Sequence, residues 1–346
     1  MPQIMHQWAL AFTFAIVGLA LGAAAGAADP PAGSRKVPVI LDTDIGDDID
    51  DTWALAMLLK SPELDLKLVV GDKGKPLYRA KLIAKLLETA GRTDVPVGVG
   101  IGSKAGAGRQ AEWVKGYDLD KYPGTVHKDG VQAIIDTIME SPEPITLIAI
   151  GPMPNVKAAL QRRPQIASRA RFVGMHGSVR RGYGGSEKIS SEYNVRADAK
   201  AAQAVFTAAW DMTITPLDTC GLVHLKAGKY AAVRDSQDPV AAAVIENYHL
   251  WRGKDKPPAS ASSTLFDTVA VYLAFASDLV ELETLGIRVT DDGHTLIDAG
   301  AKKMKVATRW KDMGAFEDLL VRRVTGPTVK PPKRAAGKAR SDGSKE

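Results

Sequence analysis

The chain has 346 residues, 45% hydrophobic and 25% charged, a balance that excludes widespread disorder, a collagen-like chain and a protein with many membrane spans. The formal net charge is +5, but residues 325–346 carry six basic and two acidic side chains, so the rest carries only +1 and is not expected to bind nucleic acid. The single cysteine, Cys220, excludes an internal disulfide bond and a multi-cysteine zinc site, and its apolar neighbours predict a buried position.

The first predicted element is an export signal over residues 1–28. Residues 8–28 form an apolar run that ends in small residues, which is typical of a secretory signal cleaved after Ala28. The segment before this run contains no Lys or Arg, and the run is about the ~20 residues that span a bilayer, so an uncleaved anchor is the alternative. After residues 29–36, a linker, the body is expected to work in the periplasm or outside the cell, without membrane contact once the signal is removed.

The body, residues 37–324, alternates buried strands with amphipathic helices. Strands are predicted over residues 37–41, 66–70, 145–150 and 171–175, and helices over residues 50–60, 77–90, 131–140, 155–161 and 198–209. This alternation predicts an α/β fold with an open, mainly parallel, Rossmann-like sheet flanked by helices. Ligands of such folds bind at the carboxyl ends of the strands. Residues 325–346 lack a hydrophobic stripe and are predicted to form a disordered basic tail.

A dense acidic cluster follows the first predicted strand. Its six carboxylates fall within ten residues and belong to Asp42, Asp44, Asp47, Asp48, Asp50 and Asp51. One or two acidic residues at the start of a helix are explained by the helix dipole, but six at a strand end repel one another strongly without a cation. Carboxylate oxygens suit Ca²⁺ or Mg²⁺, and Gly46 lets the backbone turn so that several of them face one ion.

The haloacid-dehalogenase-like phosphotransferases are one family with a comparable segment. Their first strand ends in Asp-x-Asp followed by Thr or Val, and Asp42 and Asp44 fit that pattern. Gly46, however, stands where the hydroxyl or β-branched residue belongs, and the acidic run from Asp47 to Asp51 has no counterpart there. A metal-dependent phosphatase is therefore kept as an alternative.

The segment resembles more closely the inosine–uridine-preferring nucleoside hydrolases, whose signature is a hydrophobic strand, Asp-x-Asp-x-Gly and an Asp-Asp pair before an apolar helix. The matching residues here are Asp42, Asp44, Gly46, Asp50 and Asp51. Two additional residues separate the glycine from the pair, so Asp48 is an alternative metal ligand. Further likenesses are Val-Val-Gly-Asp at residues 69–72, Ile-Gly-Pro-Met-Pro-Asn at residues 150–155, Glu-Tyr-Asn-Val at residues 192–195, and Asp267.

The resemblance implies the nucleoside hydrolase fold and a Ca²⁺-dependent hydrolase that splits ribonucleosides into ribose and free base, in purine and pyrimidine salvage. It assigns the metal to Asp44, Asp50, Asp51, Asp267 and the carbonyl of Ile150, and the sugar to Asp72, Glu192 and Asn194. Asp44 is the implied general base for a water that the metal also binds. The implied partner is a small ribosyl substrate, and a homodimer or homotetramer is expected.

One departure from the family pattern is Phe266, which stands where the best-known members have a histidine regarded as the proton donor to the leaving base. Either another group supplies the acid, or the leaving group needs little protonation, or the substrate differs. A non-catalytic or differently specific ribosyl-binding protein on the same fold is therefore a further alternative. His176 is expected to be a hydrogen-bonded loop histidine and not a catalyst.

Overall fold

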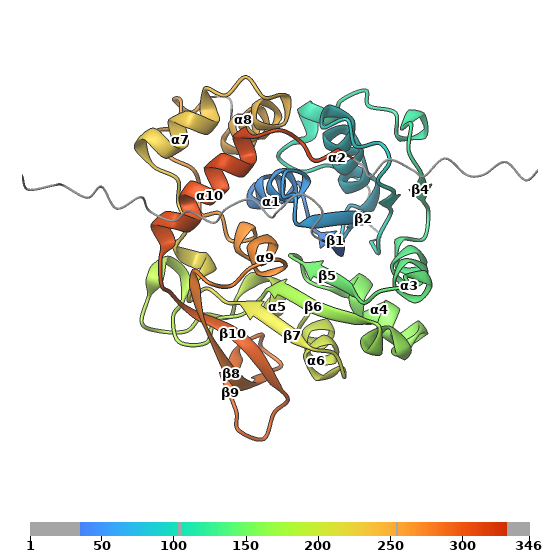
Figure 1. The fold of residues 1–346 in the computed structure, drawn as a ribbon, viewed down its shortest axis with the longest axis vertical. Helices are drawn as coiled ribbons and strands as arrows, with labels where there is room; N and C mark the ends of the chain where they lie inside the picture. Colours follow the sequence, from blue (N-terminus) through green and yellow to red (C-terminus); the bar gives the residue numbers. More distant parts are fainter. Residues whose placement is uncertain (1–34, 103–105, 254, 331–346) are drawn as a thin grey trace, which may run out of the picture.

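The computed structural model describes residues 35–102, 106–253 and 255–330. The strands of this part are β1 (Val37–Thr43), β2 (Leu64–Gly71), β3 (Val97–Gly98), β4 (Val126–His127), β5 (Ile145–Ala149), β6 (Ala170–Met175), β7 (Met212–Thr215), β8 (Val280–Val289), β9 (Thr295–Ile297) and β10 (Lys303–Trp310). The ten described strands form one sheet in the order β4-β3-β2-β1-β5-β6-β7-β10-β8-β9 (Figure 1). Pairing is parallel from β4 to β10 along this order, and antiparallel between β10 and β8 and between β8 and β9.

Helices cover both faces of this sheet. The α-helices are α1 (Asp50–Leu59), α2 (Pro76–Thr89), α3 (Gly130–Glu140), α4 (Pro154–Arg162), α5 (Tyr193–Ala197), α6 (Ala199–Thr207), α7 (Ala227–Arg234), α8 (Pro239–Arg252), α9 (Thr268–Leu273) and α10 (Met313–Thr325). Short 3-10 helices span Ala111–Val114, Leu119–Lys121, Pro164–Ser168, Tyr183–Gly185 and Cys220–Leu222. Figure 1 shows α1, α2, α8 and α10 on one side of the sheet and α3, α4 and α6 on the other. The predicted open, mainly parallel α/β fold is confirmed.

Two hydrophobic cores lie against the two faces. Because successive side chains of a strand point to opposite faces, Val39 and Leu41 of β1 enter the core under α1, α2 and α8, whereas Ile40 enters the core over α3, α4 and α6. Cys220 is fully buried in the first core, as its apolar neighbours predict.

The parallel arrangement brings several strand ends to one edge of the sheet. The last residue of β1, Thr43, pairs with Gly71 at the end of β2, and Ala149 at the end of β5 pairs with Gly174 near the end of β6. The loops that follow these strands therefore meet at a common edge, which is where an α/β sheet of this kind binds its ligand.

The first residues after the predicted body contact the end of α1. The ammonium of Lys60 donates to the carbonyl of Gly326 at 2.6 Å, and the amide of Val329 donates to the carbonyl of Leu59 at 3.0 Å. One side-chain and one backbone hydrogen bond therefore hold residues 326–329 against the end of α1, and composition alone does not reveal such contacts. The rest of the predicted tail, residues 331–346, lies outside the described residues.

The predicted signal, residues 1–28, and most of the predicted linker also lie outside the described residues. In the part of the chain that the structure describes, none of the helices is long and apolar enough to cross a membrane.

Candidate active site

A cavity of about 680 Å³ opens at the carboxyl ends of β1, β5 and β6. It is lined by acidic residues, aromatic residues and a few other groups: Asp44, Asp47, Asp48, Asp50, Asp51, Lys75, Ala107, Gly108, Arg109, Ile150, Met175, Tyr183, Glu192, Tyr193, Asn194, Trp251, Phe266 and Asp267. Seven of the eight site residues expected from the sequence are therefore brought to one cavity; they are Asp44, Asp50, Asp51, Ile150, Glu192, Asn194 and Asp267. The eighth, Asp72, is not among the lining residues.

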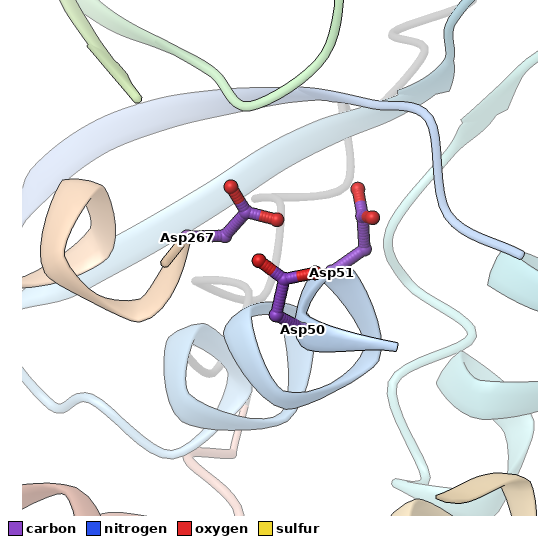
Figure 2. A group of neighbouring side chains, drawn as sticks. All are labelled: Asp50, Asp51 and Asp267. Carbon is purple, nitrogen blue, oxygen red and sulfur yellow. The ribbon is translucent and has the colours of Figure 1, made fainter. Parts of the chain in front are cut away.

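Three carboxylates meet at the floor of this cavity. Asp50 and Asp51 are the first residues of α1, and Asp267 directly precedes α9, so two helix N-termini point at the same place. Figure 2 shows the three side chains directed toward one another, and one oxygen from each lies within 4.8 Å of the others. All three residues are at most 4% exposed. The fold thus joins a carboxylate from residue 267 to a pair more than 200 positions earlier in the chain.

The electrostatics of this triad call for a cation. Burial raises the pKa of each of Asp50, Asp51 and Asp267 well above the usual value of an aspartate, and the neighbouring carboxylates raise these values further. Hydrogen bonds from the described residues offset this destabilisation of the charged carboxylates only in part. One example is the hydroxyl of Thr43, which donates to Asp51 at 2.5 Å. Buried like charges of this kind are stable when a cation shares them. The donor set, composed of carboxylate oxygens, fits a hard divalent ion such as Ca²⁺.

The alternative ligand Asp48 lies on the same cavity but outside the triad. Its carboxylate accepts the backbone N–H of Ile49 at 2.7 Å, next to the start of α1. The structure thus brings Asp50, and not Asp48, within ligand distance of Asp51 and Asp267.

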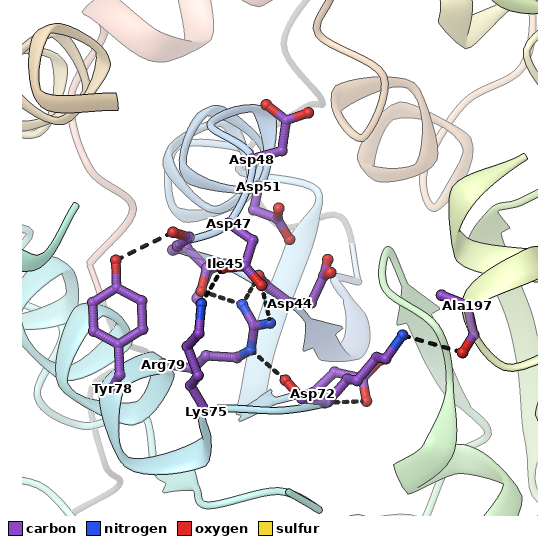
Figure 3. Close-up of polar contacts among 12 residues, drawn as sticks. Asp44, Ile45, Asp47, Asp48, Asp51, Asp72, Lys75, Tyr78, Arg79 and Ala197 are labelled. Carbon is purple, nitrogen blue, oxygen red and sulfur yellow. Dashed lines mark hydrogen bonds and ion pairs between the residues drawn. The ribbon is translucent and has the colours of Figure 1, made fainter. Parts of the chain in front are cut away.

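A buried arginine supports the loop between β1 and α1. Arg79, only 2% exposed, donates from its guanidinium to the carbonyls of Asp44 and Ile45, to the carboxylate of Asp47 at 2.8 Å, and to the carbonyl of Lys73 at 2.8 Å (Figure 3). The loop that carries the acidic cluster is therefore built around a permanent positive charge. Sequence reasoning did not single out Arg79, although its place one turn into α2, just after the second strand, was a usable signal.

Glu192 and Asn194 line the same cavity, at the start of α5. The Glu192 carboxylate accepts the backbone N–H groups of Asn194, Val195 and Gly177 at 2.7, 3.2 and 3.0 Å. Burial raises its pKa to about 7, and these three hydrogen bonds act in the opposite direction. The amide of Asn194 donates to the carbonyl of Ile150 at 3.1 Å, so the expected carbonyl ligand is already oriented by a side chain of the cavity.

Asp72, the expected sugar contact, has hydrogen-bond partners within the protein. It is fully buried, and its two carboxylate oxygens accept the backbone N–H of Lys73 at 2.7 Å and of Met153 at 2.9 Å. Both partners have positive φ, 26° for Lys73 and 67° for Met153, a strained conformation for residues with a side chain. In this structure Asp72 therefore holds the two backbone turns that border the site.

His176 likewise lies behind the cavity and not on it. Its ring is fully buried near Phe172 and Phe206, and Nε2 donates to the carbonyl of Gly151 at 3.0 Å. Burial lowers its pKa to about 4, so the ring is neutral at physiological pH.

An aromatic wall completes the cavity. The rings of Tyr183 and Phe266 meet edge to face, with centroids 6.1 Å apart and planes at 85°, and the indole N–H of Trp251 donates to the carbonyl of Asp47 at 3.2 Å. Sequence reasoning identified Phe266 but missed Tyr183 and Trp251. Tyr183 lies in the glycine-rich segment after β6, which was a usable signal, whereas nothing local marks Trp251, near the end of α8.

Comparison with known proteins agrees with this geometry. The family model described as "Inosine-uridine preferring nucleoside hydrolase" matches residues 39–318, which include every site residue described above. The chain belongs to this family. Among curated nucleoside hydrolases it is 27% identical to the pyrimidine-specific ribonucleoside hydrolase RihA of Citrobacter koseri over 319 residues, covering 83% of this chain and 98% of that protein. It is 28% identical to the probable uridine nucleosidase 2 of Oryza sativa subsp. japonica, covering 79% of this chain and 85% of that protein.

Solved nucleoside hydrolase structures share its fold. A plant nucleoside hydrolase aligns with a TM-score of 0.71 and 24% identity, covering 85% of this chain and 100% of that chain. A purine-preferring ribonucleoside hydrolase from Gardnerella vaginalis aligns with a TM-score of 0.66 and 21% identity, covering 83% of this chain and 98% of that chain.

Proposed function

We propose that this nucleoside hydrolase family member hydrolyses the N-glycosidic bond of ribonucleosides in a Ca²⁺-dependent reaction that yields ribose and free base. The observation that carries this proposal is the buried triad of Asp50, Asp51 and Asp267 on a cavity that also holds Asp44 and Glu192. Carboxylates gathered in this way suit a hard cation and the hydroxyls of a sugar.

The cation is assigned to Asp44, Asp50, Asp51, Asp267 and the carbonyl of Ile150. When bound, it supplies a positive charge that attracts the sugar hydroxyls and makes a water molecule more acidic. Asn194 holds the Ile150 carbonyl in place at 3.1 Å, and Thr43 holds Asp51.

Hydrolysis builds positive charge on the sugar ring and negative charge on the departing base, and the site must stabilise that state more than the bound substrate. Asp44 accepts a proton from the attacking water as general base. Glu192 and Asn194 face the same cavity and position the sugar. Asp72 contributes from behind by holding the backbone at Lys73 and Met153.

The phosphatase alternative is disfavoured by the family match and by the loop itself. Gly46 has φ of 107°, and a β-carbon at this position would lie 2.6 Å from the side chains of Leu82 and Tyr78. The phosphotransferase pattern requires a Thr or Val near this position. Either residue would have a strained backbone here, and its side chain would clash with Leu82 and Tyr78.

A panel of ribosides tests the proposal. The full chain is stripped with a chelator, dialysed, and assayed for reducing-sugar release from inosine, adenosine, uridine and cytidine with and without added Ca²⁺, and for phosphate release from ribose 5-phosphate. The expected result is Ca²⁺-dependent sugar release from at least one nucleoside without phosphate release. Tight ribose binding with no turnover on any riboside would favour the binding-protein alternative, and phosphate release would favour the phosphatase.

We also propose that the protein is exported to the periplasm or secreted, which rests on the apolar run at residues 8–28. Mass spectrometry of the protein from fractionated cells should find a mature chain that begins after Ala28 outside the cytoplasm. A full-length chain in the membrane fraction would support the uncleaved anchor.

A further inference from the structure

The departing base needs a partner that the acidic floor of the cavity does not provide. As the bond between the sugar carbon and the base nitrogen breaks, its electron pair stays with the base. The carboxylates of Asp50, Asp51 and Asp267 repel that charge, so the base must leave along another part of the lining. The aromatic wall around Tyr183 and Phe266 is the part with an apolar surface for a flat ring.

Within this wall, Tyr183 has a hydroxyl that is oriented by the backbone. Its oxygen accepts the N–H of Tyr193 at 2.9 Å, while its ring rests edge-on against Phe266. The loop that carries it is fastened in turn, because the backbone N–H of Tyr183 donates to the hydroxyl of Ser190 at 3.3 Å. Since the phenol oxygen receives a hydrogen bond there, its own proton is available for an acceptor in the cavity.

The phenol of Tyr183 also stays protonated under ordinary conditions. Burial raises its pKa to about 12, and the nearby carboxylate of Glu192 acts in the same direction. A neutral donor of this kind stabilises developing negative charge by hydrogen bonding and does not have to give up its proton.

Three of the other donors on or near the cavity are engaged or differently placed. The ammonium of Lys75 pairs with Asp47 at 2.9 Å, and the guanidinium of Arg109 lies 5.5 Å over the ring of Trp251. His176 is buried behind the cavity, with Nε2 bound to a carbonyl.

We propose that the Tyr183 hydroxyl donates a hydrogen bond to the departing base as the glycosidic bond breaks, an inference that rests on the proposed function. In this step the water oxygen bonds to the sugar carbon, the water proton passes to Asp44, and the bond's electron pair goes to the base. Tyr183 keeps its proton, and the base takes one from solvent after release. Phe266 is a positioning residue that holds the tyrosine ring.

Tyr183→Phe, measured on two substrates, tests this inference. One substrate is the nucleoside that the unaltered protein hydrolyses best, and the other is 4-nitrophenyl riboside, whose leaving phenolate needs no donor. We expect kcat on the nucleoside to fall by roughly 100-fold, with kcat on the nitrophenyl riboside changed by less than about threefold. Tyr117→Phe is the matched control, because its hydroxyl bonds to Glu88 away from the cavity, and it should leave both rates unchanged.

An equal loss on both substrates would overturn the inference, since it would indicate a structural role for Tyr183. Unchanged rates on both, or a nucleoside-selective loss in Arg109→Met and not in Tyr183→Phe, would also overturn it. These outcomes are distinct from failure of the proposed function, in which the unaltered protein would hydrolyse neither substrate in the presence of Ca²⁺.

Discussion

Asp44 differs from the carboxylates of the triad in its electrostatic surroundings. Burial raises its pKa to about 6, and the positive charge of Arg79 keeps it from rising further. A carboxylate that burial makes less acidic accepts a proton more readily, as a general base requires. Asp44 follows β1 directly, and its side chain opens onto the cavity while its carbonyl is held by Arg79 (Figure 3).

Asp44→Asn should therefore fold normally and lose hydrolysis. We expect kcat to fall by roughly 10³-fold or more, because the amide cannot accept the proton of the attacking water. Steady-state sugar release measures the loss, and a thermal melt with Ca²⁺ present checks that the variant is folded. Activity within tenfold of the unaltered protein would remove Asp44 from the role of base.

His176 makes stability depend on pH. Its pKa is about 4 in the folded protein because of burial, and about 6.5 when exposed in the unfolded chain. As pH falls below the pKa of the unfolded chain, the unfolded chain binds a proton at His176 that the folded protein does not bind. The free energy of unfolding therefore decreases as pH falls from the unfolded pKa to the folded pKa. The loss from this one residue is about 2 kcal/mol between pH 7 and pH 5.

Urea unfolding at these two pH values, with His176→Gln as the comparison, measures this contribution. Glutamine does not titrate and can still donate to the carbonyl of Gly151. We expect the unaltered protein to lose about 2 kcal/mol more than the variant on going from pH 7 to pH 5. Identical pH dependence of the two proteins would show that the histidine is not held neutral.

At the scale of elements, the loop between β1 and α1 depends on a helix that follows later in the chain. Arg79 of α2 donates to the carbonyls of Asp44 and Ile45 and pairs with Asp47. Removing the guanidinium leaves buried carbonyls without donors and the acidic loop without its nearest positive charge.

Arg79→Met should lower the free energy of unfolding by about 3 kcal/mol and weaken Ca²⁺ binding, because the loop that presents Asp44 and Asp50 loses its anchor. Urea unfolding and calorimetric titration with Ca²⁺ measure the two effects. Arg163→Met, at an exposed position after α4, is the matched control and should change neither. Equal stability of the two variants would mean that the loop holds its shape without Arg79.

Elements that begin the chain could be predicted because their hydrophobic pattern is local. The predicted strands and helices through residue 209 all appear, with ends shifted by a few residues. The short elements β3, β4 and α5, and all of β7 to β10 and α7 to α10, were not predicted. β7 has only four residues, and β8 has partly exposed faces, so neither shows a clear period. Their pairing depends on contacts with distant strands.

The same distinction between local and distant signals applies to the site. Asp44, Asp50 and Asp51 are close in sequence, and a strand followed by a helix places them together. Asp72 was expected to face the sugar, but a buried carboxylate needs donors, and the amides of Lys73 and Met153 supply them. That arrangement depends on a loop eighty residues later and has no local signature.

At the scale of the whole molecule, the proposed cation would couple folding to metal binding through the triad. Asp50 and Asp51 begin α1 in one part of the chain, and Asp267 precedes α9 in another, so an ion bound by all three links segments that are far apart in sequence (Figure 2). The unfolded chain cannot present these oxygens together. A ligand bound only by the folded state stabilises it by mass action.

Removing Ca²⁺ with a chelator should therefore lower Tm. Free Ca²⁺ at about 100 times its Kd stabilises by about 2.7 kcal/mol, which corresponds to roughly 4–5 °C for a domain of this size. Differential scanning calorimetry with and without chelator measures the shift. Asp50→Asn should abolish most of it, because Asp50 is in the triad, whereas Asp48→Asn should retain most of it, because Asp48 lies outside. If Asp48→Asn lost the shift and Asp50→Asn kept it, Asp48 and not Asp50 would be the ligand. The absence of any shift in the unaltered protein would refute the metal site.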